Sequence, residues 1–139
     1  MAETTFIHLT DLHIGDPAVA DPHLFSDTSA TLELVLSMIG TVQPAPSFII
    51  ASGDLTNRGD AESYRQLRRI MAKVDLPIVY ALGNHDTRPG FYAGMLDRTD
   101  GLDAPYDHDR VIGGVHLIVL DTSTPGQIGG TIEPDQFEW

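Results

Sequence analysis

The chain has 139 residues, a length that suits one domain or part of one. Acidic residues outnumber basic ones by 20 to 8, and the net charge of −12 argues against binding to nucleic acid polymers or to anionic membranes. Because it has no cysteine, the chain can form neither disulfides nor thiolate metal sites. The N-terminus lacks the basic and apolar segments of a signal peptide, so we expect a cytoplasmic protein.

The first third of the sequence predicts a strand, a long loop and a helix. A short β-prone run predicts the strand at Phe6–Thr10. Glycine, proline and aspartate are frequent between residues 14 and 27, which is typical of a loop. The helix is predicted over Thr28–Val42, where Leu34 and Met38 have the spacing of one amphipathic face.

The middle of the sequence predicts two further strands with a helix between them. Phe48–Ser52 is an almost continuous apolar run, which is typical of a strand buried on both faces. Asp60–Val74 has apolar residues at helical spacing, and Ile78–Leu82 follows as the third strand. We expect the inner face of the helix to consist of Tyr64, Leu67, Ile70 and Met71.

The last third predicts a hairpin of Val111–Ile112 and Val115–Leu120, with Gly113 and Gly114 at the turn. Glu133–Trp139 has the proline and acidic residues of a helix beginning. Because strands and helices alternate, we expect an α/β layered fold with a parallel first sheet. Since the sequence stops one turn into a helix, we expect residues 1–139 to be the N-terminal part of a single domain, truncated at the C-terminus.

Polar side chains follow each of the three predicted strands. They are Asp11 and His13 after the first strand, Gly53-Asp54 after the second, and Gly83-Asn84-His85-Asp86 after the third. Ligands of open α/β sheets bind outside the carboxyl ends of the strands. We therefore expect these side chains to meet in one crevice.

The side chains in this crevice are of the types that bind divalent metals. Asp11 and His13 are two residues apart in extended chain, so both side chains can bind one ion. Asp54 has two carboxylate oxygens with which to bridge two ions, and Asn84 offers a neutral oxygen to the second ion. Oxygen and imidazole ligands suit Mn²⁺, Fe²⁺ or Fe³⁺ and Zn²⁺. Taken alone, Asp11 or Asp54 could instead cap a turn.

Two residues of the third cluster are candidates for catalysis. His85 could donate a hydrogen bond to a phosphate oxygen or protonate a leaving alkoxide. Asp86 could orient the His85 imidazole. Asn84 and His85 are also the residues that we expect to contact substrate.

These three motifs, in this order, resemble the calcineurin-like metallophosphoesterase superfamily. Gly53–Asp60 and Leu120–Ser123 are similar to its class III cyclic-nucleotide phosphodiesterase and glycerophosphodiesterase branch. The resemblance covers essentially the whole chain. It implies a four-layer α/β/β/α sandwich, of which this chain supplies the first half.

The resemblance also implies a ligand set. Asp11, His13 and Asp54 would bind one metal ion, Asp54 and Asn84 the other, and His85 would face the substrate. Family members supply three further histidines, the last two in a Gly-His-x-His motif. Two histidines follow His85 in this sequence, and neither is part of such a motif.

The resemblance predicts hydrolysis of a phosphodiester, either a cyclic nucleotide or a glycerophosphodiester, by a hydroxide bound to two metal ions. A homo-oligomer is a further expectation from the family. Two alternatives stay open at this point. One is a phosphomonoesterase, and the other is a non-catalytic metal-binding fragment, if 139 residues make up the whole protein.

Overall fold

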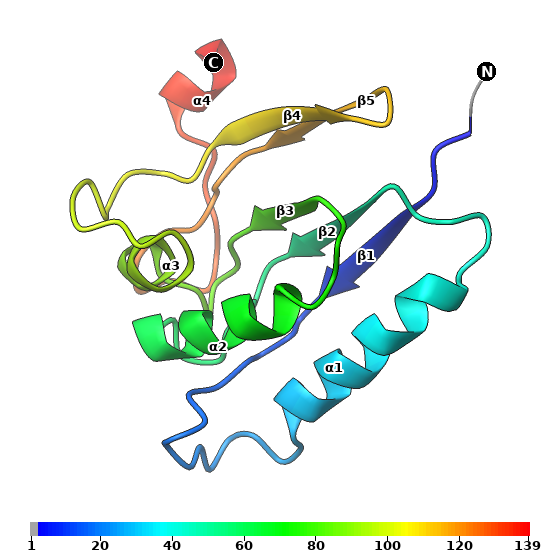
Figure 1. The fold of residues 1–139 in the computed structure, drawn as a ribbon. Helices are drawn as coiled ribbons and strands as arrows, with labels where there is room; N and C mark the ends of the chain where they lie inside the picture. Colours follow the sequence, from blue (N-terminus) through cyan, green and yellow to red (C-terminus); the bar gives the residue numbers. More distant parts are fainter. Residues whose placement is uncertain (1–2) are drawn as a thin grey trace.

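A sheet of three parallel strands lies at the centre of the computed structural model, which describes residues 3–139 (Figure 1). The strands are β1 (Phe6–Thr10), β2 (Phe48–Ser52) and β3 (Ile78–Ala81), in the order β1-β2-β3. Their pairing is parallel throughout. The three predicted strands, the parallel sheet and the α/β fold class are thereby confirmed.

Helices α1 (Thr28–Met38) and α2 (Ala61–Met71) lie on one side of this sheet in Figure 1, and helix α3 (Arg88–Met95) lies beside α2. Each of the three begins with a side-chain cap, which satisfies a backbone N–H that the first helical turn leaves free. The capping residues are Asp27, Asp60 and Thr87. The four residues predicted for the inner face of α2 are all buried.

The buried face of α1 differs from the predicted one. Leu32 and Leu36 are buried, whereas Leu34 and Met38 are 64% and 58% exposed. The helix also ends at Met38 and continues as one 3₁₀ turn over Ile39–Thr41. Apolar residues lie on both possible stripes of this helix, so their spacing alone could not decide which stripe would be buried.

A hairpin beside β3, at the free edge of the sheet, consists of β4 (His108–Ile112) and β5 (Val115–Val119) (Figure 1). Gly113 and Gly114 form its turn, with φ of 59° and 79°. A two-residue turn of this kind needs positive φ at both positions, which glycine adopts without steric cost. The hairpin is confirmed, and so is the helix beginning, α4 (Pro134–Glu138). No helix within residues 3–139 is long and apolar enough to cross a membrane.

Helices α2 and α3 approach each other closely at Gly94. A Cβ atom at this position would lie 2.3 Å from the carbonyl oxygen of Ala61 and 2.7 Å from Cβ of Tyr64. The rings of Tyr64 and Phe91 meet edge to face next to this contact, with centroids 5.5 Å apart. Glycine at position 94 therefore lets α3 pack closely against α2, the helix that follows the polar loop after β2.

Gly94→Ala should lower the free energy of unfolding by about 2 kcal/mol, because the methyl group forces the two helices apart. This cost outweighs the gain of about 1 kcal/mol that alanine brings to a helix interior. Gly40→Ala is the matched control, since a Cβ there meets nothing within 4 Å. Denaturant unfolding of both variants measures the difference. Equal stabilities would contradict the close helix contact.

Candidate metal centre

The loops after the three strands stay together beyond the sheet. The backbone N–H of Gly53 donates to Ala81 at 2.9 Å, and those of Asp11 and His13 donate to Gly53 and Asp54 at 3.2 and 2.9 Å. The hydrogen bonding between strands therefore continues into the loops. This continuity holds the polar residues of the first two loops side by side at the carboxyl edge of the sheet.

Three of the candidate ligands have a left-handed backbone. Within residues 3–139, four residues other than glycine have positive φ, and Asp11, His13 and Asp54 are three of them, at 55°, 46° and 49°. Such backbone costs about 1–3 kcal/mol at each non-glycine residue and is concentrated at functional sites. Strain at these positions supports a role for these side chains beyond folding.

The side chains of His13, Asp54 and His85 offer one ligand atom each, and these atoms lie within 4.8 Å of one another. Nε2 of His13 is 3.9 Å from a carboxylate oxygen of Asp54 and 3.9 Å from one of Asp11. The rings of His13 and His85 are edge to face, with centroids 4.8 Å apart. The Nδ1 atom of His13 is buried without a hydrogen-bond partner. These four residues therefore form a compact group of oxygen and imidazole donors that could hold a metal ion.

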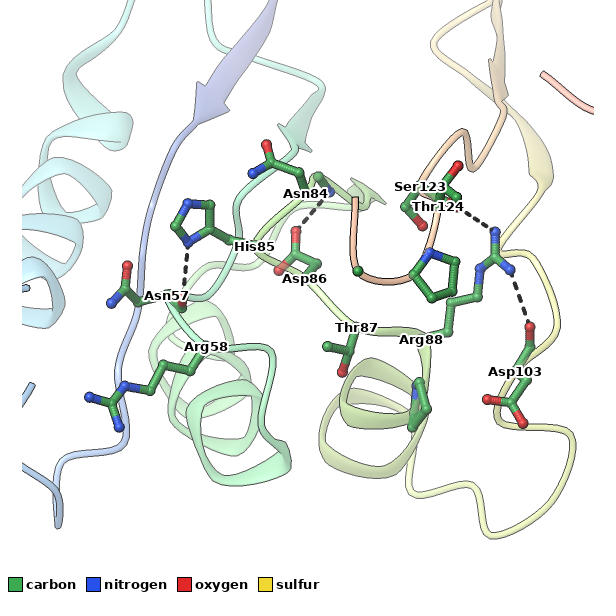
Figure 2. A pocket seen from close by; sticks show the side chains of 14 residues that line it. Asn57, Arg58, Asn84, His85, Asp86, Thr87, Arg88, Asp103, Ser123 and Thr124 are labelled. Atoms are coloured by element: carbon green, nitrogen blue, oxygen red, sulfur yellow. Dashed lines mark hydrogen bonds between the residues drawn. The ribbon is translucent and has the colours of Figure 1, made fainter. Parts of the chain in front are cut away.

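The ring of His85 is oriented by a backbone carbonyl. Its Nδ1 lies 2.9 Å from the carbonyl oxygen of Asn57 (Figure 2). Because a carbonyl can only accept, Nδ1 must carry a proton, which leaves Nε2 as the ring nitrogen that can act on another group. The backbone N–H of His85 also donates to Asp54 at 3.0 Å. The sequence placed His85 outside the ligand set, whereas the structure groups its ring with His13 and Asp54.

The carboxylate of Asp86 does not contact His85 and instead binds the backbone of two loops. It accepts from the N–H groups of Leu55, Thr56 and Gly83 at 2.8–3.1 Å, and from the hydroxyl of Tyr64 at 2.7 Å. Burial raises the pKa of the Asp86 carboxyl, although these donors partly offset the rise. The expectation that Asp86 orients the imidazole is therefore wrong, because its oxygens point into the protein.

Asn84 is exposed and lines a cavity of about 590 Å³ together with His85 (Figure 2). The far wall of this cavity consists of Pro89 and the segment from Ser123 to Gly126. Arg88 lines the same cavity and holds that wall in place, because its Nε donates to Asp121 at 2.8 Å and its Nη2 to the carbonyl of Ser123 at 3.0 Å. The cavity adjoins the donor group on the side of Asn84 and His85.

The two histidines that follow His85 are engaged elsewhere. His108 lies 3.0 Å from the carbonyl of Tyr80 on β3, and His116 pairs with Asp109 across the hairpin at 2.7 Å. Neither ring joins the donor group of His13, Asp54 and His85.

Comparison with known proteins agrees with this geometry. The profile of the calcineurin-like phosphoesterases matches residues 4–131. The chain belongs to the calcineurin-like phosphoesterase family. The family that the three sequence motifs indicated is therefore confirmed.

Several calcineurin-like relatives are similar to almost the whole chain. A probable cyclic nucleotide phosphodiesterase of Rhodococcus erythropolis is 35% identical, over 96% of this chain and 44% of its own length. A cAMP/cGMP dual specificity phosphodiesterase of Mycobacterium tuberculosis is 32% identical, over 96% and 42%. A 3′,5′-cyclic adenosine monophosphate phosphodiesterase of Pseudomonas aeruginosa is 31% identical, over 93% and 49%. The chain thus spans less than half the length of these relatives.

Asp86→Asn should destabilise this calcineurin-like chain by about 3 kcal/mol, because the amide turns two donors toward N–H groups that need an acceptor. Tyr64→Phe removes one of the donors and should cost about 1 kcal/mol. The control is Asp75→Asn, which changes an exposed aspartate. Denaturant unfolding ranks the three variants. An Asp86→Asn protein as stable as Asp75→Asn would contradict the anchoring role of this carboxylate.

Proposed function

We propose that the protein containing this chain hydrolyses a phosphodiester with the help of two divalent metal ions. The observation that carries this proposal is the convergence of His13, Asp54 and His85 within 4.8 Å at the carboxyl edge of a parallel sheet. Membership of the calcineurin-like phosphoesterase family supports it.

Asp11, His13 and Asp54 would hold one ion, and Asp54 and Asn84 the other. The position of Nε2 of His13, 3.9 Å from carboxylate oxygens of both Asp11 and Asp54, and the strained backbone at three of these residues support this assignment. Oxygen and imidazole donors favour manganese, iron or zinc. When bound, such a pair of ions supplies a hydroxide nucleophile at neutral pH and neutralises charge on the phosphoryl group. Further ligands would have to come from residues other than these four.

His85 would act on the substrate through Nε2, because its Nδ1 is held by the carbonyl of Asn57. When Nε2 also carries a proton, it would donate a hydrogen bond to a phosphate oxygen or give that proton to the leaving alkoxide. Asn84 borders the cavity from the same loop and would contact the phosphate beside it. Both residues are exposed, as substrate contacts require.

A diester fits this site better than a monoester. The cavity of about 590 Å³ next to Asn84 and His85 has room for a second ester group. The relatives named above are phosphodiesterases of cyclic nucleotides, which supports a cyclic nucleotide as substrate, with a glycerophosphodiester as the other candidate. The cytoplasmic location and the homo-oligomer stay predictions from the sequence.

Asp54→Ala should abolish manganese-dependent cleavage of bis(p-nitrophenyl) phosphate, because the carboxylate shared by both ions is lost. Activity is followed by release of p-nitrophenol, and bound manganese by elemental analysis. Asp75→Ala serves as the control, since Asp75 is exposed and precedes β3, whereas the third motif follows that strand. Wild-type activity in Asp54→Ala would rule out the bridging role.

His85→Ala should slow turnover about 10²- to 10⁴-fold, the range typical of a lost general acid or base. The variant should keep most of its bound manganese, because Asp11, His13, Asp54 and Asn84 remain. His23→Ala, in an exposed part of the first loop, is the matched control. If His85→Ala lost all of its manganese, His85 would be a metal ligand rather than a substrate-facing group.

A further inference from the structure

An aspartate in the loop between β1 and α1 reaches across to the loop after β2, in which the carbonyl of Asn57 contacts His85. The carboxylate of Asp21 accepts from Nδ2 of Asn57 and from Nε of Arg58, both at 2.7 Å. Its side chain is only 7% exposed although the surrounding loop is open to solvent. The hydrogen bond from Arg58 is the main reason why the pKa of Asp21 lies well below its usual range, so the carboxyl stays ionised.

Asn57 is fixed from several sides. Its side chain is held by Asp21, its backbone N–H donates to Ile14 at 3.0 Å, and its carbonyl oxygen accepts from Nδ1 of His85 at 2.9 Å. The orientation of that carbonyl sets which nitrogen of His85 carries the proton and where Nε2 points. A carboxylate that immobilises Asn57 therefore acts on His85 without touching it.

We propose that Asp21 is a positioning residue for His85 and acts through Asn57. The inference rests on the proposed function, in which Nε2 of His85 meets the substrate. Asp21 restricts the rotation of Asn57 and thereby keeps the His85 ring aimed at the donor group of His13 and Asp54. A loop with little secondary structure of its own thus contributes to the precision of the site.

Asp16 offers a matched comparison from the same loop. Both aspartates accept a local turn hydrogen bond, Asp16 from the N–H of Ala18 at 2.8 Å and Asp21 from that of His23 at 2.9 Å. Of the two, Asp21 also binds residues of the loop that follows β2. Asp16→Asn therefore reproduces the loss of charge and the local perturbation without touching Asn57.

A double-mutant cycle separates positioning from a general weakening of the protein. Asp21→Asn should lower kcat for bis(p-nitrophenyl) phosphate about ten-fold with KM unchanged, a typical loss for a residue that orients another. In the His85→Ala background the same change should have no further effect, because the group that it positions is gone. Asp16→Asn should leave kcat unchanged in both backgrounds. Equal losses from Asp21→Asn in both backgrounds, or none in the wild-type background, would overturn the proposal.

A spectroscopic readout does not depend on activity. The proton on Nδ1 of His85 can be observed by NMR in ¹⁵N-labelled protein and identified by its absence from His85→Ala. We expect this signal in the wild type and in Asp16→Asn, and its loss through faster exchange with water in Asp21→Asn. An unchanged signal in Asp21→Asn overturns the inference. If the wild type cleaves no phosphodiester, the proposed function fails, and the NMR signal still decides whether Asp21 positions His85.

Discussion

The buried carboxylate of Asp86 is the interaction on which the arrangement of the site depends. It accepts hydrogen bonds from backbone N–H groups of the loop after β2 and of the loop after β3, and from the hydroxyl of Tyr64 on α2. A buried charge is tolerated only when such donors surround it, so neither loop can move away without a large cost. Asp54 precedes one of these donors and Asn84 follows another, so the same bonds place both candidate ligands.

The sequence alone predicted those features that depend on the residue pattern of a single short segment. Phe6–Thr10 and Phe48–Ser52 were predicted to the residue, because continuous β-prone runs bounded by polar residues leave few alternatives. The convergence of polar residues at the strand ends followed from the rule that parallel strands present their carboxyl ends to one crevice. The pairing of Asp11, His13 and Asp54 in space is a consequence of that rule and of the loop hydrogen bonds.

The sequence failed where the outcome depends on packing between distant segments. Asp86 adjoins His85 in the chain, and adjacency suggested a catalytic pair, yet the turn sends the two side chains in different directions. The true partner of His85 is a main-chain carbonyl, which no side-chain pattern can reveal. The buried face of α1 was predicted wrongly for a related reason. Apolar residues lie along two stripes of this helix, and packing against the rest of the protein decides which stripe is buried.

The left-handed backbone of Asp11, His13 and Asp54 lowers the stability of the fold at three positions whose side chains are candidate metal ligands. Glycine would adopt these angles without steric cost, so a glycine at any of them would relieve local strain. Each such replacement would also remove a donor atom from the group that could hold metal. Selection for stability alone would therefore favour loss of these donor atoms. A relative with glycine at these positions would fold well but could not hold metal through these side chains.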